Sequence, residues 1–138
     1  MFMRDGMYLP WDDPRWRGFK NEPAVILAAA FEHVTDWGRA IDGGAHVGGW
    51  TRFLSERFSY VEAFELSTLN ADCLKRNMAD YRNVTCYNVA LGADTGMVDY
   101  EGDGAADSTV ARVINGVRIP LEAIAAFEFP SCGRIKLD

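Results

Sequence analysis

The chain contains few residues of the kinds that bind metals or form cross-links. It has three cysteines and two histidines among 138 residues. Cys73, Cys86 and Cys132 are odd in number and form no Cys-x-x-Cys pair, which argues against a disulfide framework and against a zinc site. His33 and His46 do not cluster with other ligands, and we expect His33 to face outward from a helix. The sequence therefore predicts no bound metal and a protein suited to a reducing compartment.

Long apolar runs are also absent. The longest mostly apolar stretch, residues 23–31, is far shorter than the roughly 20 residues that cross a bilayer. Arg4 and Asp5 stand where the apolar part of a signal peptide would begin, and no small-residue cleavage site follows. We therefore expect a soluble, cytoplasmic protein with no membrane partner.

Positive charge is scarce relative to negative charge. Fourteen Lys and Arg residues stand against twenty Asp and Glu residues, so the formal net charge is −6 and the pI is near 4.9. Such a field repels phosphate backbones, and we expect no nucleic-acid partner. One segment interleaves aromatic and basic side chains with two aspartates, and we interpret it as an N-terminal arm packed by its tryptophans. Its members are Trp11, Asp12, Asp13, Arg15, Trp16, Arg17 and Lys20.

Helix-like and strand-like segments alternate through most of the chain. Residues 1–20 show no clean period and are interpreted as an arm or a short strand, and one domain follows over 21–138. Asn21-Glu22-Pro23 predicts the start of a helix that Gly38 ends. The next expected elements are a strand at 39–42, a helix at 50–58, a strand at 60–64, a helix capped by Ser67 or Thr68, and a strand at 83–90. This order predicts an α/β fold with a doubly wound, mostly parallel sheet.

The helix after Ser67 has a predicted inward face. Leu69, Cys73, Leu74, Met78 and Tyr81 recur at helical spacing and should lie toward the core. We expect Cys73 on this helix and Cys86 on the following strand to be small apolar fillers rather than nucleophiles.

The region after Gly92 breaks the alternation. We expect a strand at 98–100, a loop at 102–107, and a hairpin of strands 109–114 and 117–120 around Asn115-Gly116, because that dipeptide favours a tight hairpin turn. We interpret this region as an antiparallel insertion. A short helix at 121–127 and a strand at 134–138 complete the prediction.

A glycine-rich turn follows the strand at 39–42 and reads Asp-Gly-Gly-Ala-His-Val-Gly-Gly over residues 42–49. Glycines let the backbone bend tightly and let a ligand approach, and the N-terminus of the following helix can offer N–H groups to an anion. Glu65 stands 23 positions after Asp42, at the end of the next strand, where a carboxylate can accept hydrogen bonds from both hydroxyls of a ribose. The pattern alone also suits a nicotinamide or flavin enzyme, and the glycines could be plain turn formers with Glu65 a solvated strand end.

Beyond these features, the stretch from Ala40 to Asp138 resembles the FkbM-type methyltransferases. That family shows Asp-x-Gly-Ala-Asn-x-Gly, then Phe-Glu-Pro with an Asn, Asn-Val-x-Ala-Leu, Leu-Asp, and Ile-Lys-x-Asp-x-Glu-Gly. The matching residues here are Asp42, Gly44, Ala45, Gly48, Phe64, Glu65, Asn70, Asn88, Val89, Ala90, Leu91, Gly92, Leu121, Ile135, Lys136 and Asp138. The departures are His46 for Asn, Leu66 for Pro and Glu122 for Asp, and the family's Glu-Gly after Asp138 is absent.

The resemblance implies a Rossmann-like methyltransferase fold that binds S-adenosyl-L-methionine. The glycine turn would hold the methionine end, Glu65 the ribose, and residues 89–91 would flank the adenine. The implied cofactor-binding set is Asp42, Gly43, Gly44, Ala45, His46, Gly48, Glu65, Leu66, Asn70, Val89, Ala90 and Leu91. Asp138 is the candidate general base or acceptor-orienting group, with Lys136 or His46 behind it.

The leading hypothesis is therefore an O-methyltransferase acting on a small molecule or a sugar. An NAD(P)-dependent oxidoreductase using the same turn is one alternative, and Asp42 before the glycines and the stretch 88–92 favour the methyltransferase. A cofactor-binding fragment without turnover is another, because the family's C-terminal strands are not in the chain. The strand at 134–137 would then leave an unpaired edge, which predicts dimerisation or poor solubility.

Overall fold

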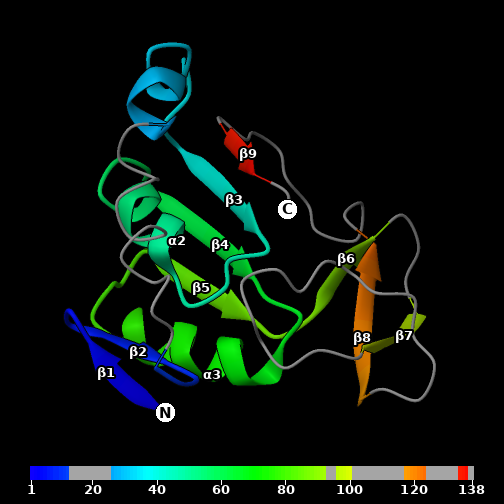
Figure 1. Cartoon of the computed structure of the whole chain (residues 1–138). Helices are drawn as coiled ribbons and strands as arrows, with labels where there is room; N and C mark the ends of the chain where they lie inside the picture. Colours follow the sequence, from blue (N-terminus) through cyan, green and yellow to red (C-terminus); the bar gives the residue numbers. More distant parts are fainter. Residues whose placement is uncertain (13–25, 93–95, 101–116, 124–133, 137–138) are drawn as a thin grey trace.

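The computed structural model describes residues 1–12, 26–92, 96–100, 117–123 and 134–136 (Figure 1). Residues 26–31 are helical, and two further helices span Gly49–Ser55 (α2) and Thr68–Asn77 (α3). The strands are β1 (Phe2–Arg4), β2 (Met7–Leu9), β3 (Arg39–Gly43), β4 (Tyr60–Phe64), β5 (Val84–Tyr87), β6 (Ala90–Gly92), β7 (Gly96–Tyr100), β8 (Val117–Ala123) and β9 (Arg134–Lys136). Across these ranges, no helix combines the length and the apolar character needed to cross a bilayer.

The main sheet has four parallel strands in the order β5-β4-β3-β9. In both β3 and β4, four of the five residues are buried, as expected for strands covered on both faces. The chain adds β4 and β5 on one side of β3 and later places β9 on the other side, the order of the first four strands of a doubly wound sheet. The predicted α/β fold with a mostly parallel sheet is confirmed. The predicted dimer through the edge of the last strand stays a prediction.

Helices pack on one face of this sheet. Leu27 of the first helix and Leu54 of α2 contact Ala40 and Val61, two neighbours in the strand register, and Phe58 closes this cluster. The first helix ends at Phe31 rather than near Gly38. Phe31, Val34 and Trp37 nevertheless pack against the same cluster.

The inward face of α3 differs from the prediction at one end. Cys73, Leu74 and Met78 are buried, as expected, and Leu74 packs with Ala63 of β4. Leu69, however, is 56% exposed, and Asn70 takes the buried position beside it. The reason is geometric: the buried stripe runs through Asn70 and Leu74, and Leu69 lies to one side of it.

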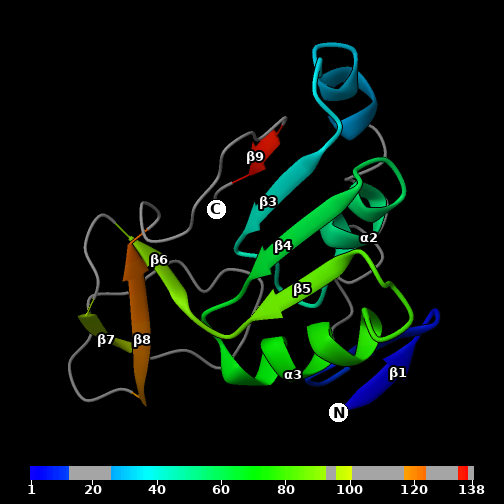
Figure 2. The same cartoon turned by 180° about the vertical axis from the view of Figure 1, so that it is seen from behind.

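A second, three-stranded sheet has the order β6-β8-β7, with β6 parallel and β7 antiparallel to β8. It lies beyond the carboxyl ends of β3, β4 and β5, as both views show (Figure 2). The strand predicted over 83–90 is therefore two strands in two sheets, β5 and β6.

The helix predicted over 121–127 is wrong at its start. Residues 121–123 belong to β8 and pair with β6 through Ala90↔Leu121 and Gly92↔Ala123. Pairing with a distant strand outweighs the moderate helix propensity of a Leu-Glu-Ala segment. Val117 pairs with Tyr100 of β7, whereas residues 102–107, the turn at 115–116 and the expected strand at 109–114 lie outside the described residues.

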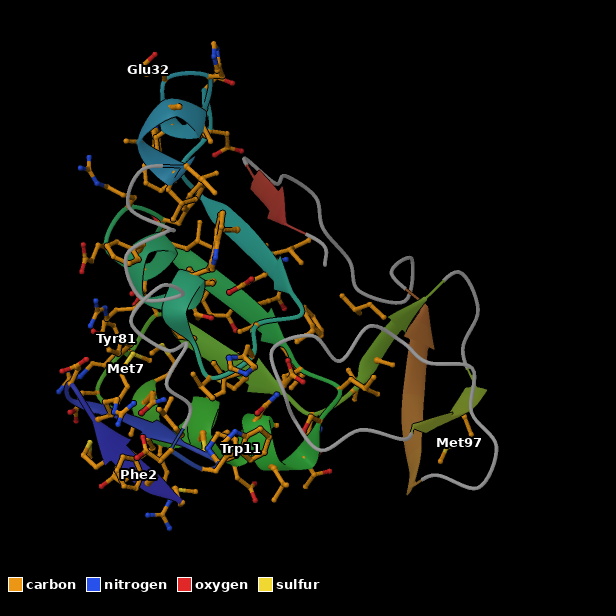
Figure 3. The ribbon with its side chains drawn as sticks, in the orientation of Figure 1. Phe2, Met7, Trp11, Glu32, Tyr81 and Met97 are labelled. Carbon is orange, nitrogen blue, oxygen red and sulfur yellow. The ribbon has the colours of Figure 1, made fainter. Side chains whose placement is uncertain are left out.

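The N-terminus forms a hairpin in which β1 pairs antiparallel with β2. Asp5 and Gly6 connect the strands with φ values of 50° and 79°, the left-handed conformation of a two-residue type I′ turn. Met7 and Leu9 of β2 pack on Cys73 of α3, and Figure 3 labels Phe2 and Met7 on this hairpin. The expected arm thus begins with two strands, and residues 13–20 of it lie outside the described residues.

Candidate functional site

The glycine loop after β3 and the acid after β4 meet at the carboxyl edge of the main sheet. The backbone N–H of His46 donates to Oε2 of Glu65 at 2.7 Å, and the N–H of Ser67 donates to Oε1 at 2.7 Å. Glu65 is 7% exposed. Neighbouring parallel strands bring the loops at their carboxyl ends together, which is why the sequence could place these two segments side by side. Glu65 therefore links the glycine loop to the start of α3.

Several amides of the glycine loop already have partners within the protein. Ala45 N–H donates to the carbonyl of Phe64 at 2.9 Å, and Gly48 N–H donates to the carbonyl of Ala45 at 2.9 Å. Together with the His46 amide, three of the N–H groups expected to meet an anion are thus engaged. A ligand at this loop would be held by other groups, among them side chains at the ends of β4 and β5.

His46 and Gly48 of the glycine loop have left-handed backbone conformations, which few residue types adopt. His46 has φ = 52°, a left-handed conformation in which Asn, Asp and His are enriched among non-glycine residues. This explains how His can stand where the resembling family has Asn. Gly48 has φ = 97°, and a Cβ there would lie 3.0 Å from Cδ1 of Leu74 and 3.1 Å from Cε of Met78. Gly48 thus lets the loop approach α3 closely.

Asp42 lies on the helix-covered face of β3 and is fully buried. Its Oδ2 accepts a hydrogen bond of 2.6 Å from Oγ1 of Thr51 in α2. The carboxylate therefore fastens α2 to β3 directly behind the glycine loop. Thr51 was not predicted, although its place nine residues after Asp42, in the helix that follows the turn, is a usable signal.

The half-buried thiol of Cys86 lies on the same face, in the cluster with Ala63 and Leu74. Burial raises the pKa of this thiol to about 11, while Lys75 lowers it and Asp42 raises it further. Burial likewise raises the pKa of the Cys73 thiol. Both cysteines therefore stay protonated at neutral pH, in keeping with their prediction as fillers.

Asn88, which directly follows β5, holds the backbone of the loop that carries Glu65. Asn88 Nδ2 donates to the carbonyl of Glu65 at 2.9 Å and to that of Leu66 at 3.0 Å. The rings of Phe64 and Tyr87 stack with centroids 4.8 Å apart. Asn88 was named in the prediction only as a match to the family motif, and its structural role is to fix the backbone behind the carboxylate.

The remaining predicted residues surround this edge. Leu66, Val89, Ala90 and Leu91 are partly exposed, and Gly43 ends β3 with Gly44 next to it. Asn70 is 1% exposed, and its N–H donates to Ser67 Oγ at 3.4 Å. Among the described residues, its Oδ1 has no hydrogen-bond partner.

The two residues predicted to act on the acceptor lie at or beyond the end of β9. The register pairs Lys136 with Asp42, so β9 runs toward the same edge as β3 and the glycine loop. Asp138 lies outside the described residues. His33 is exposed, as expected. In the described ranges, no three His, Cys, Asp or Glu side chains gather as a metal site would require.

No family model and no curated protein matches the chain. Among solved structures, it is similar to phosphoethanolamine N-methyltransferase 1 of Haemonchus contortus, solved with phosphoethanolamine and S-adenosylhomocysteine (17% identity, TM-score 0.43, 50% of this chain and 15% of that one). It is also similar to a SAM-dependent methyltransferase of Aquifex aeolicus (18% identity, TM-score 0.43, 55% of this chain and 42% of that one). A third similar structure is the SAM-bound amino pentose methyltransferase of Micromonospora echinaspora (20% identity, TM-score 0.43, 59% of this chain and 35% of that one). The chain thus spans less than half the length of each, and likenesses at such scores assign it no activity.

Proposed function

We propose that this chain binds S-adenosyl-L-methionine at the carboxyl edge of its main sheet and transfers the methyl group to a hydroxyl of a small molecule or sugar. The observation that carries the proposal is the 2.7 Å bond from His46 N–H to Glu65 Oε2, which joins the glycine loop to the acid. In doubly wound folds this pair of features binds the ribose-bearing part of a cofactor. The sequence resemblance to FkbM-type methyltransferases supports methyl transfer as the chemistry.

The residues at this edge fit such a cofactor. Two backbone amides fix the Glu65 carboxylate, whose oxygens offer about four acceptor positions in all, so a ribose diol can share it with them. Asn70 Oδ1 is a buried acceptor that no donor in the described part of the chain reaches, and a ligand N–H would satisfy it. Residues 89–91 would lie beside the adenine, and the loop of His46 beside the methionine part.

The bound cofactor would supply an electrophilic methyl group on a sulfonium sulfur. The chain's own task is then to hold an acceptor oxygen in line with that methyl at about 3–3.5 Å. Asp138 would take the hydroxyl proton, with Lys136 or His46 orienting the acceptor. The parallel register of β9 beside β3 supports this assignment, since β9 runs toward the edge that carries the glycine loop.

Calorimetric titration with S-adenosylhomocysteine tests the binding step. We expect a Kd in the micromolar range, about −6 to −8 kcal/mol. Glu65→Gln should weaken binding at least about tenfold, because hydrogen bonds to a charged group contribute about 1.5–3 kcal/mol. Glu62→Gln is the matched control: Glu62, on β4, is as buried as Glu65, but its oxygens face Tyr87 and Arg39 instead of the glycine loop.

Three outcomes would count against the proposal. Binding of NADH in place of S-adenosylhomocysteine would favour an oxidoreductase, and silence for both ligands would remove the cofactor site. Equal losses in the two Gln variants would show that Glu65 acts only on stability. Methyl transfer itself is tested by release of S-adenosylhomocysteine in the presence of polyhydroxy acceptors, where Asp138→Asn should lower kcat and leave the Kd for S-adenosylhomocysteine unchanged.

A further inference from the structure

The outer edge of the N-terminal hairpin is completed by a side chain of α3. Around the two-residue turn, Arg4 pairs with Met7 and Met3 with Tyr8. Hydrogen-bonded and non-hydrogen-bonded pairs alternate in antiparallel strands, so the N–H and C=O of Tyr8 point away from β1. Asn77 Oδ1 accepts the Tyr8 N–H at 2.7 Å, and Asn77 Nδ2 donates to the Tyr8 carbonyl at 3.0 Å. One carboxamide thus takes the place of a third strand.

The same carboxamide also binds the glycine loop. Asn77 Nδ2 donates to the carbonyl of Val47 at 2.7 Å. The side chain of Val47 is fully buried and packs with Met7 and Leu9 of β2. Both the backbone and the side chain of Val47 are therefore held between the hairpin and α3.

Val47 directly follows His46, whose amide binds Glu65. A continuous set of contacts thus runs from Tyr8 through Asn77 and Val47 to the carboxylate of Glu65. We propose that the β1–β2 hairpin is a clamp on the cofactor loop, with Asn77 as its positioning residue, so that docking of the hairpin and binding of the cofactor favour each other. The coupling to the cofactor rests on the proposed function, whereas the clamp on the loop does not.

The coupling has a measurable form in both directions. Loss of the Asn77 bonds should loosen the loop and weaken S-adenosylhomocysteine binding about tenfold, within the range that positioning changes produce. Coupling of binding equilibria is reciprocal, so S-adenosylhomocysteine should slow hydrogen exchange at the Tyr8 amide of the unmodified protein by a similar factor.

Asn77→Ala and Asn83→Ala form a matched pair. Asn83 Nδ2 also donates to two backbone carbonyls, those of Ser55 and Phe58 at 2.8 and 3.0 Å, but Ser55 is the last residue of α2 and Phe58 lies three residues beyond it, away from the glycine loop in the sequence. Hydrogen exchange measured on the ligand-free proteins should show the His46 amide exchanging about tenfold faster in Asn77→Ala than in Asn83→Ala. Calorimetry should show the loss of affinity in Asn77→Ala alone.

A second variant keeps the test decisive if Asn77→Ala does not fold. Tyr8→Pro removes the N–H that is donated to Asn77 and leaves the β1–β2 ladder in place, because that N–H points away from β1 and proline is tolerated at such an edge. It also removes a ring that packs on the hairpin core and lies under Arg76, so Tyr8→Ala, which loses the ring but keeps the N–H, is its control. Tyr8→Pro should also speed exchange at His46.

The results of these experiments separate a failure of the clamp from a failure of the proposed function. Equal exchange at His46 in the Asn77 and Asn83 variants, or no effect of Tyr8→Pro, would overturn the clamp. If the unmodified protein does not bind S-adenosylhomocysteine, the proposed function fails and the coupling with it. The exchange comparison then still decides whether the hairpin holds the loop.

Discussion

Replacing Gly48 with alanine should cost the protein a large share of its stability. The residue has φ = 97°, where a side chain costs about 1–2 kcal/mol. The added Cβ would also lie 3.0 Å from Leu74 and 3.1 Å from Met78, both buried, and crowding of a packed core costs about 1–3 kcal/mol. We therefore expect the free energy of unfolding to fall by about 2–5 kcal/mol.

Urea denaturation of three alanine variants separates the two causes. Gly6 has φ = 79° but nothing within 4 Å of the added Cβ, so Gly6→Ala should cost only the conformational part, about 1–2 kcal/mol. Gly96 also has open space around the added Cβ, and its φ lies outside the left-handed range, so Gly96→Ala should be neutral or stabilising by about 0.4–1 kcal/mol. If Gly48→Ala loses no more than Gly6→Ala, the close approach of the loop to α3 is refuted.

Two further predictions concern polar groups on the helix-covered face behind the site. Thr51→Val should lower the free energy of unfolding by about 1–3 kcal/mol, because the buried Asp42 carboxylate loses the hydrogen bond from Thr51. Thr51→Ser keeps the hydroxyl and should lose less, and equal losses in the two variants would contradict the hydrogen bond. Burial raises the pKa of Cys86 to about 11, so the rate at which iodoacetamide alkylates this thiol should keep rising between pH 9 and 11. Peptide mapping would follow the alkylation, and a plateau in the rate by pH 9 would contradict the raised pKa. Because the fold favours the neutral thiol, Cys86 contributes stability below pH 9 that is lost as the pH rises toward 11.

The sequence predicted the elements whose signals are local. The run Tyr60–Phe64 and the start of β3 at Arg39 were predicted correctly, because buried parallel strands are short apolar runs bounded by turns. The position of Glu65 beside the glycine loop followed from the order of these elements. Its role toward a cofactor stays a prediction.

Other features depended on partners far away in the chain. Asn77 looks like an ordinary polar residue of a helix, and its partners Tyr8 and Val47 lie 69 and 30 positions away. Residues 121–123 have helical propensity, and only pairing with β6 makes them a strand. The hairpin turn is a different case, because Asp5-Gly6 is a strong type I′ signal that was present in the sequence. Its strands of three residues were too short to show a period.

The short connection between the two sheets has a mechanical consequence. Only Asn88 and Val89 separate β5 of the main sheet from β6 of the second sheet, and so short a link reaches about 10 Å at most. Asn88 is also the residue whose side chain grips the carbonyls of Glu65 and Leu66. A displacement of β6 relative to the main sheet would therefore act directly on Asn88, and through its two hydrogen bonds on the backbone behind Glu65.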